Sequence, residues 1–241
     1  MTRPNPAPRC YFSLRSPYSW LAHHDLLTRY PDLAATVEWR PFWEPDPLSL
    51  RMLTEAGGRF PYVENSRPKA RYILQDVRRL AAQRGLAVSW PVDRQPCWEV
   101  AHLAYLVARR TGHGPRFVAR TYQARWQEGR DISDPATIAA IAGELGLRPD
   151  ELTGAVDDPQ VRAEGLQALL EIDRDGVFGV PFFVLGFEKF WGVDRLPLFA
   201  AAVRDRALGR PSPPAPAGWP GPGPERGADT AADLGHAGGC G

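Results

Sequence analysis

The segments typical of β-strands lie near the two ends of this chain, and a long run of helical patterns separates them. On the N-terminal side, the strand candidates are Arg9–Ser13 and the alternating stretch Thr36–Phe42. On the C-terminal side, they are Phe182–Leu185 and a last strand that contains Phe190 and Trp191. The order of elements is therefore βαβ, many helices, then ββα. It predicts an α/β fold in which a four-stranded mixed sheet carries a large all-helical insertion.

Helical segments fill most of the rest of the chain. The first one opens at Ser16 or Pro17 and runs to about Arg29, with Pro17 at the favoured first helical position. The helices expected between the strands are Pro68–Arg84, Trp98–Arg110, Phe117–Gln127, one that Asp134 caps with Pro135 just inside it, Asp150–Ala155 and Pro159–Arg174. A last helix, Asp194–Ala207, follows the fourth strand.

These elements predict three regions. Residues 9–45 and 176–207 together form the domain that contains the sheet, and residues 46–175 form the helical insertion subdomain. Residues 208–241 are expected to be a disordered tail. The tail is rich in Pro, Gly and Ala and has no apolar periodicity, so burial cannot offset its ordering entropy.

Composition and charge exclude several classes of function. The net charge is +1, so nothing indicates nucleic acid as a partner. No apolar run approaches the roughly 20 residues that span a bilayer, and no signal-peptide core is present, so we expect a cytoplasmic protein without a membrane partner. The three cysteines and five histidines lack the spacing of a disulfide framework or a metal site, so no metal is expected.

The first motif with chemical meaning is Ser16-Pro17-Tyr18-Ser19, which follows a strand and opens a helix. A helix N-terminus presents free N–H groups and a partial positive charge, so it stabilises an anion placed there. A hydroxyl at this point can also donate a hydrogen bond to a thiolate. The alternative is purely structural, because serine is a preferred N-cap residue and Ser16 could serve only as a cap.

Two further motifs lie next to the C-terminal strands. A Gly-Val-Pro stretch that ends at Pro181 precedes an apolar strand, where an X-Pro bond can be cis. A cis bond would leave the backbone of Val180 free to pair with an extended, peptide-like ligand, whereas the structural alternative is an ordinary turn. In the stretch WGVD, the carboxylate of Asp194 could hold the ammonium group of a ligand or simply cap the last helix.

In this order and spacing, the motifs resemble a known family. The strongest pieces are YFSLRSPYSWLA, KARYILQD, WQEGRDISDP and GVFGVPFFVLGFEKFWGVDRL. Over roughly residues 9–207, the chain is similar to the 2-hydroxychromene-2-carboxylate isomerases and kappa-class glutathione transferases of the disulfide-oxidoreductase superfamily. The resemblance implies a thioredoxin-like domain, a helical insertion and a glutathione site. Homodimers are common in this family, so a homodimer stays open.

The resemblance also assigns roles to single residues. The superfamily has Cys-Pro-x-Cys where this chain has Ser-Pro-Tyr-Ser, and Ser16 matches the catalytic serine of the isomerases and kappa transferases. The residues that match glutathione contacts are Lys69, Val180, Pro181 and Asp194. The resemblance implies that Val180 supplies a backbone contact to glutathione and that Asp194 contacts its γ-glutamyl end.

Three departures from the family remove side-chain hydrogen-bond partners. Val193 stands where the family has Ser or Asn before Asp194. The family's Asn before the helix of Lys69 is replaced near residues 57–59, and its Asn-Ser pair is replaced at Cys97. Another low-molecular-weight thiol is therefore an alternative to glutathione, and a non-catalytic, ligand-binding member of the fold is a further alternative.

The predicted function is isomerisation of a conjugated double bond, cis to trans or the reverse, in a small aromatic or polyene-type substrate. A thiolate held near Ser16 would add to an electron-poor C=C bond, the bond would rotate, and the thiol would leave. Glutathione transfer to an electrophile is the enzymatic alternative, because it uses nearly the same site. Thiol–disulfide exchange is disfavoured, because Ser16 and Ser19 provide neither a nucleophilic nor a resolving sulfur.

Four aromatic residues and one cysteine are candidates for the substrate pocket. Its walls could contain Tyr18, Trp98, Tyr122 and Trp126, with ordinary core packing as the alternative. Cys97 stands at the expected start of a helix, where the helix dipole would lower the pKa of its thiol. If no external thiol is used, Cys97 is the candidate nucleophile.

Overall fold

The computed structural model describes residues 7–61 and 65–210 of the chain. Within them, a sheet of four strands has the order β2-β1-β3-β4. The strands are β1 (Arg9–Phe12), β2 (Glu38–Pro41), β3 (Phe182–Leu185) and β4 (Glu188–Trp191). β1 pairs in parallel with β2 and antiparallel with β3, and β3 pairs antiparallel with β4. The predicted four-stranded mixed sheet is therefore confirmed.

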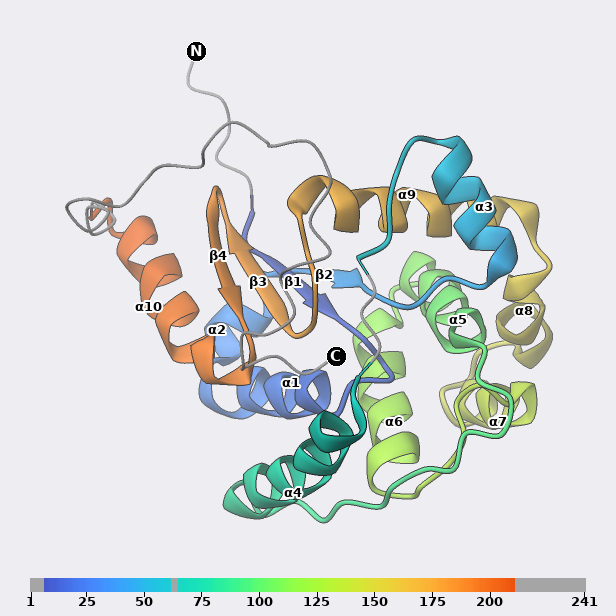
Figure 1. Ribbon diagram of the computed structural model, residues 1–241, viewed down its shortest axis with the longest axis horizontal. Coiled ribbons are helices and arrows are strands. Elements are labelled where there is room, and N and C mark those ends of the chain that lie inside the picture. The colour runs from blue at the N-terminus through green and yellow to red at the C-terminus, as the bar shows by residue number, and fades with distance from the viewer. Residues whose placement is uncertain (1–6, 62–64, 211–241) are drawn as a thin grey trace.

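Helices from both ends of the chain pack around this sheet (Figure 1). They are α1 (Pro17–Arg29), α2 (Pro31–Ala34) and α10 (Leu196–Ala207), with the short 3-10 helix η2 (Val193–Arg195) before α10. α10 packs on β3 and β4, and η2 packs on α1. In the core, Phe183 of β3 stacks on Phe199 of α10, with 4.9 Å between the ring centres.

The chain between β2 and β3 forms only helices and loops in its described part. These helices are α3 (Pro47–Glu55), α4 (Arg67–Gln83), α5 (Trp98–Arg110), α6 (Gly114–Trp126), α7 (Pro135–Glu144), α8 (Pro149–Thr153), the 3-10 helix η1 (Gly154–Val156) and α9 (Pro159–Asp175). Figure 1 shows α3 and α5 to α9 gathered on one side of the sheet, with α4 next to α1. The all-helical insertion is confirmed, whereas its limits at residues 46 and 175 stay predictions. Most of the predicted tail, residues 211–241, lies outside the described residues.

Local capping chemistry explains where several of these helices begin. Side-chain caps followed by proline precede α1, α3, α7 and α9, at Ser16, Asp46, Asp134 and Asp158. A side-chain oxygen at the N-cap accepts a hydrogen bond from a first-turn N–H. Proline at the next position has a φ angle that is already fixed near the helical value.

The sequence prediction missed two helices and shifted others. α2 has only four residues, too few to show a helical periodicity. α3 was readable, because Asp46 and the proline after it repeat the capping pattern of α7. α6 begins at Gly114 instead of Phe117. Asp194 lies inside η2, and α10 begins two residues later without a side-chain cap, so the capping alternative for Asp194 is wrong.

Candidate functional site

Ser16 lies at the junction of β1 and α1, and its side chain caps the helix. Its Oγ accepts a hydrogen bond from the N–H of Ser19 at 3.2 Å, and the residue is 2% exposed. Within the described residues, the hydroxyl hydrogen of Ser16 has no acceptor. A serine hydroxyl can accept and donate at the same time. The capping role of Ser16 therefore leaves its hydrogen available for an anion at the start of α1.

The segment before β3 lies beside the end of β1, because Phe182 at the start of β3 pairs with Tyr11. The Val180–Pro181 peptide bond is cis, as predicted, and both residues are buried. The backbone N–H of Gly192 donates to the carbonyl of Pro181 at 2.9 Å, which ties this segment to the residues that lead into η2. Because η2 packs on α1, the Pro181 segment, η2 and α1 form one connected region of the molecule.

The two charged residues predicted to bind the cofactor both face solvent. Lys69 is in the first turn of α4, where its backbone N–H donates to the capping Oγ of Ser66. Asp194 forms an ion pair with Arg195 at 2.7 Å, and the side chains of both are more than half exposed. Exposed pairs of this kind contribute little free energy, so Asp194 can exchange Arg195 for the cationic end of a ligand.

These residues fit a peptide-like thiol, although two neighbouring contacts are absent. Ser16 offers a free hydroxyl hydrogen at a helix N-terminus, and Lys69 and Asp194 offer opposite charges in solvent. Val193 is buried and apolar, so it adds no hydrogen bond. A Cβ atom on Gly58 would lie 2.5 Å from Leu53 Cδ1, so a side chain there would require Leu53 to move.

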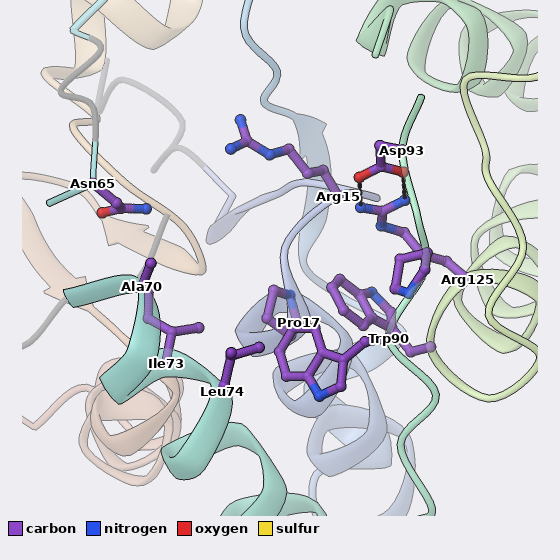
Figure 2. Close-up of a pocket in the computed structure, with 11 residues that line it drawn as sticks. Arg15, Pro17, Asn65, Ala70, Ile73, Leu74, Trp90, Asp93 and Arg125 are labelled. Carbon is purple, nitrogen blue, oxygen red and sulfur yellow. Dashed lines mark hydrogen bonds and ion pairs between the residues drawn. The ribbon is translucent and has the colours of Figure 1, made fainter. Parts of the chain in front are cut away.

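A pocket of about 230 Å³ opens beside Ser16, between the start of α1, helix α4 and the segment around residues 90–93 (Figure 2). Its lining residues are Arg15, Pro17, Asn65, Ala70, Ile73, Leu74, Trp90, Pro91, Asp93, Arg125 and Trp126. Figure 2 shows Pro17 between the α4 side chains and Trp90, with Asp93 and Arg125 at the other end. Arg15 and Pro17 line the pocket, whereas Ser16 between them is not a lining residue and is 2% exposed.

One of the five residues predicted for the substrate pocket lines this cavity. That residue is Trp126, which packs edge-on against Trp90 at 5.4 Å between ring centres. The other three aromatic residues belong to its support. Tyr18 and Tyr122 are buried, and their hydroxyls donate to Asp76 Oδ2 at 2.9 Å and to the Ser13 carbonyl at 3.0 Å. Trp98 is buried, and the guanidinium groups of Arg15 and Arg125 lie over its ring.

The comparisons with known proteins agree with this fold. A family model for the DSBA-like thioredoxin domain matches residues 9–204. The chain belongs to the DSBA-like thioredoxin domain family. Its predicted thioredoxin-like fold is thereby confirmed.

Individual relatives of this DSBA-like chain include an isomerase and a transferase. The 2-hydroxychromene-2-carboxylate isomerase of Sphingobium xenophagum is 29% identical over 199 residues, covering 81% of this chain and 96% of the relative. Glutathione S-transferase kappa 1 of Homo sapiens is 24% identical over 229 residues, covering 87% and 97%. A solved structure of a 2-hydroxychromene-2-carboxylate isomerase has a TM-score of 0.66 at 21% identity, covering 85% of this chain and 99% of that structure. The predicted relationship to both groups is confirmed.

Cys97 differs from the sequence expectation in its electrostatics. It is the N-cap residue of α5, but burial raises the pKa of its thiol, and the nearby charge of Glu99 raises it further. The expected lowering by the helix dipole is therefore wrong, because burial and a carboxylate outweigh it. Potential ligand atoms of Asp46, Cys97 and Glu99 lie within 4.8 Å of one another. Arg162 already neutralises Asp46, with 2.9 Å between Nη1 and Oδ2.

A buried histidine, which the sequence prediction left without a role, holds the loop before Ser16. His102 of α5 accepts a hydrogen bond from the N–H of Leu14 at 3.0 Å through Nε2, and its Nδ1 lies 2.6 Å from the carbonyl of Trp98. This pattern assigns the proton to Nδ1 of a neutral ring. Burial lowers the pKa of His102 to about 3, so the imidazole stays neutral and structural.

Proposed function

We propose that this protein is a cis–trans isomerase of a conjugated double bond in a small aromatic or polyene-type substrate, with glutathione or another low-molecular-weight thiol as cofactor. The observation that carries the proposal is Ser16, whose hydroxyl hydrogen is unused at the N-terminus of α1. The isomerase relative, aligned over 96% of its length, supports this activity. The pocket at the start of α1 has one apolar wall, which suits a flat conjugated molecule.

Each residue of the site has a defined task in this proposal. Ser16 donates its hydroxyl hydrogen to the sulfur, and the start of α1 adds partial positive charge, so both lower the pKa of a bound thiol. Lys69, Val180, Pro181 and Asp194 hold the thiol, as the resemblance implies. When bound, the thiolate supplies reversible addition to an electron-poor C=C bond, which permits rotation before the thiol leaves unchanged. No protein residue is consumed.

Glutathione transfer to an electrophile is the second candidate, and the kappa transferase relative favours it. The same residues would hold and activate the thiol, but the product would leave as the thiol adduct. A ligand-binding protein without catalysis is the third candidate, and Val193 and Gly58 favour it because neither offers a side-chain hydrogen bond.

An assay with 2-hydroxychromene-2-carboxylate, with and without glutathione, separates these candidates. Product absorbance and free thiol are followed together. We expect product to form only with the thiol, and the concentration of free thiol to stay constant. Loss of free thiol in step with the absorbance change would support transfer instead. Binding of glutathione in a titration without any turnover would support the ligand-binding alternative.

The expected setting of the enzyme also stays a proposal. Within the described residues, no helix is long and apolar enough to cross a membrane. We propose a small-molecule enzyme of the cytoplasm that needs neither a metal ion nor nucleic acid. Size measurement in solution would test whether it forms the homodimer that is common in the related family.

A further inference from the structure

Arg15 is the residue of the pocket whose charged group solvent and ligands can reach most easily. It stands between β1 and Ser16, and its side chain is 31% exposed. Its guanidinium forms an ion pair with Glu44 and lies 5.0 Å from the ring centre of Trp98. Only Nη1 is engaged by Glu44, so most of the five N–H donors of this guanidinium face other directions.

Arg125, by contrast, is fixed. Two parallel hydrogen bonds of 2.8 Å join it to the carboxylate of Asp93, and its side chain is only 3% exposed. Its guanidinium lies 5.1 Å from the ring centre of Trp98 and 4.9 Å from that of Trp126. The negative charge of Asp93 at the pocket is therefore held mainly by Arg125, and its Coulombic interaction with Arg15 is the weaker one.

Two buried donors on the pocket-lining residues lack acceptors. Within the described residues, neither Arg125 Nε nor Trp126 Nε1 has a hydrogen-bond partner. Buried polar groups are normally satisfied. Both atoms are shielded from solvent, so the partly exposed charged donor among the residues that line the pocket is the guanidinium of Arg15.

The opposite wall of the pocket is apolar. Ile73 and Leu74 of α4 face it together with Pro17, and the indole of Trp90 is 38% exposed (Figure 2). Trp90 is also held edge-on to Trp126. A ligand with a flat apolar body and an anionic oxygen group at one end could contact the apolar wall with its body and the guanidinium of Arg15 with its anionic group.

We infer that Arg15 is the residue that selects the substrate of the proposed isomerase, by binding an anionic carboxylate-type group while Trp90 and the α4 side chains contact the apolar body. A guanidinium binds a carboxylate through two parallel hydrogen bonds, which fixes orientation as well as charge. A ligand would compete with Glu44 for Arg15, because the two side chains form an ion pair. The inference rests on the proposed function for its site, but its test needs no turnover.

The test compares two probes of the same shape in the absence of thiol. Calorimetric titration of the full chain with trans-cinnamate and with neutral trans-cinnamamide measures the contribution of the charge. We expect the wild-type protein to bind the carboxylate about 10- to 100-fold more tightly, as for a hydrogen bond to a charged group. Arg15→Gln should bind both probes with equal affinity. Glu44→Gln should bind cinnamate more tightly than wild type and leave the affinity for the amide unchanged.

Arg94→Gln is the matched control, because Arg94 is exposed in the same region and does not line the pocket. It should keep the wild-type preference. Equal affinity of the wild-type protein for both probes, no binding of either, or a preference that survives Arg15→Gln would overturn the inference. If Arg15→Gln does not fold, the Glu44→Gln variant tests the inference instead. An affinity of Glu44→Gln for cinnamate equal to that of wild type would overturn the inference. Selective binding without isomerase turnover would contradict the proposed function, and Arg15 would remain assigned as the residue that binds an anionic group in this pocket.

Discussion

At the scale of single residues, Ser16 has a structural and a proposed chemical role that mutation can separate. Ser16→Ala removes the hydrogen bond to Ser19 N–H, and loss of a serine cap costs about 0.5–2 kcal/mol of stability. It also removes the only hydroxyl hydrogen proposed to reach the thiolate. We expect turnover per folded molecule to fall by about 10-fold or more, since hydrogen bonds to charged groups contribute about 1.5–3 kcal/mol. Urea unfolding and thiol-dependent turnover measure the two effects.

The matched control for Ser16→Ala is a cap remote from the pocket. Asp158 caps α9 by accepting from the N–H of Gln160 at 2.7 Å, and it does not line the pocket. Asp158→Ala should lower stability by a similar amount and leave turnover unchanged. If Ser16→Ala behaves like this control, the hydroxyl of Ser16 is only structural.

Two buried histidines predict how stability depends on pH. Burial lowers the folded-state pKa of His102 to about 3 and that of His23 to about 4, against 6.5 for an exposed histidine. Below pH 6.5 the unfolded chain therefore binds protons that the folded protein does not. Stability should fall as pH decreases from 6.5 to 5, with each histidine contributing up to about 1.4 kcal/mol per pH unit. Urea unfolding of wild type and His102→Gln across this range should show a smaller slope for the variant; equal slopes would contradict the role assigned to His102.

At the scale of elements, α4 depends on α1 for its position. Arg84, the C-cap residue of α4, donates to both carboxylate oxygens of Asp25 in α1, at 3.0 and 2.6 Å, and the two side chains are 10% and 5% exposed. α4 also contributes Ile73 and Leu74 to the pocket wall. This buried pair therefore fixes one side of the site.

Breaking the pair from one side should be costly. Asp25→Asn leaves the charge of Arg84 buried and unpaired, so we expect the free energy of unfolding to fall by about 3–5 kcal/mol. Replacing both partners, as in Asp25→Leu with Arg84→Met, should recover part of this loss because no unpaired charge remains. Urea unfolding of Asp25→Leu, of Arg84→Met and of the variant with both changes measures the coupling energy between the two side chains. Purely additive effects would show that the pair contributes nothing of its own.

Most strands and helices could be predicted from the sequence, but the pocket could not. Strand alternation and capping pairs at Ser16 and Asp134 are local signals, so most strands and helices were predictable. The pocket wall around Trp90 and Asp93 lies in a segment without periodicity, and its partner Arg125 is 32 residues away in the chain. Arg125 beside Trp126 looks like an ordinary surface arginine until α6 is packed. Contacts of this kind depend on tertiary structure and leave no pattern in the sequence.

At the scale of the whole molecule, the DSBA-like thioredoxin fold is present without a cysteine pair at the start of α1. The start of α1 carries Ser16 and Ser19 in place of two cysteines. Of the cysteines in the described residues, Cys10 is buried in β1, where desolvation raises the pKa of its thiol far above the usual range. Cys97 is half-buried at the start of α5, and its thiol pKa is also raised. A pair of reactive thiols is therefore absent from the described part of the chain.

The protein should consequently show no disulfide reductase activity, and the missing thiols can be restored. In an insulin-reduction assay with dithiothreitol, we expect the wild-type protein to give only the background rate. Ser16→Cys combined with Ser19→Cys creates Cys-Pro-Tyr-Cys at the N-terminus of α1, where helix charge lowers a thiol pKa. This double variant should reduce insulin above background, whereas Ser16→Cys alone should not, because it lacks a resolving thiol. A wild-type rate equal to that of the double variant would show that sulfur chemistry resides elsewhere in the chain, and would remove the reason for assigning Ser16 to an external thiol.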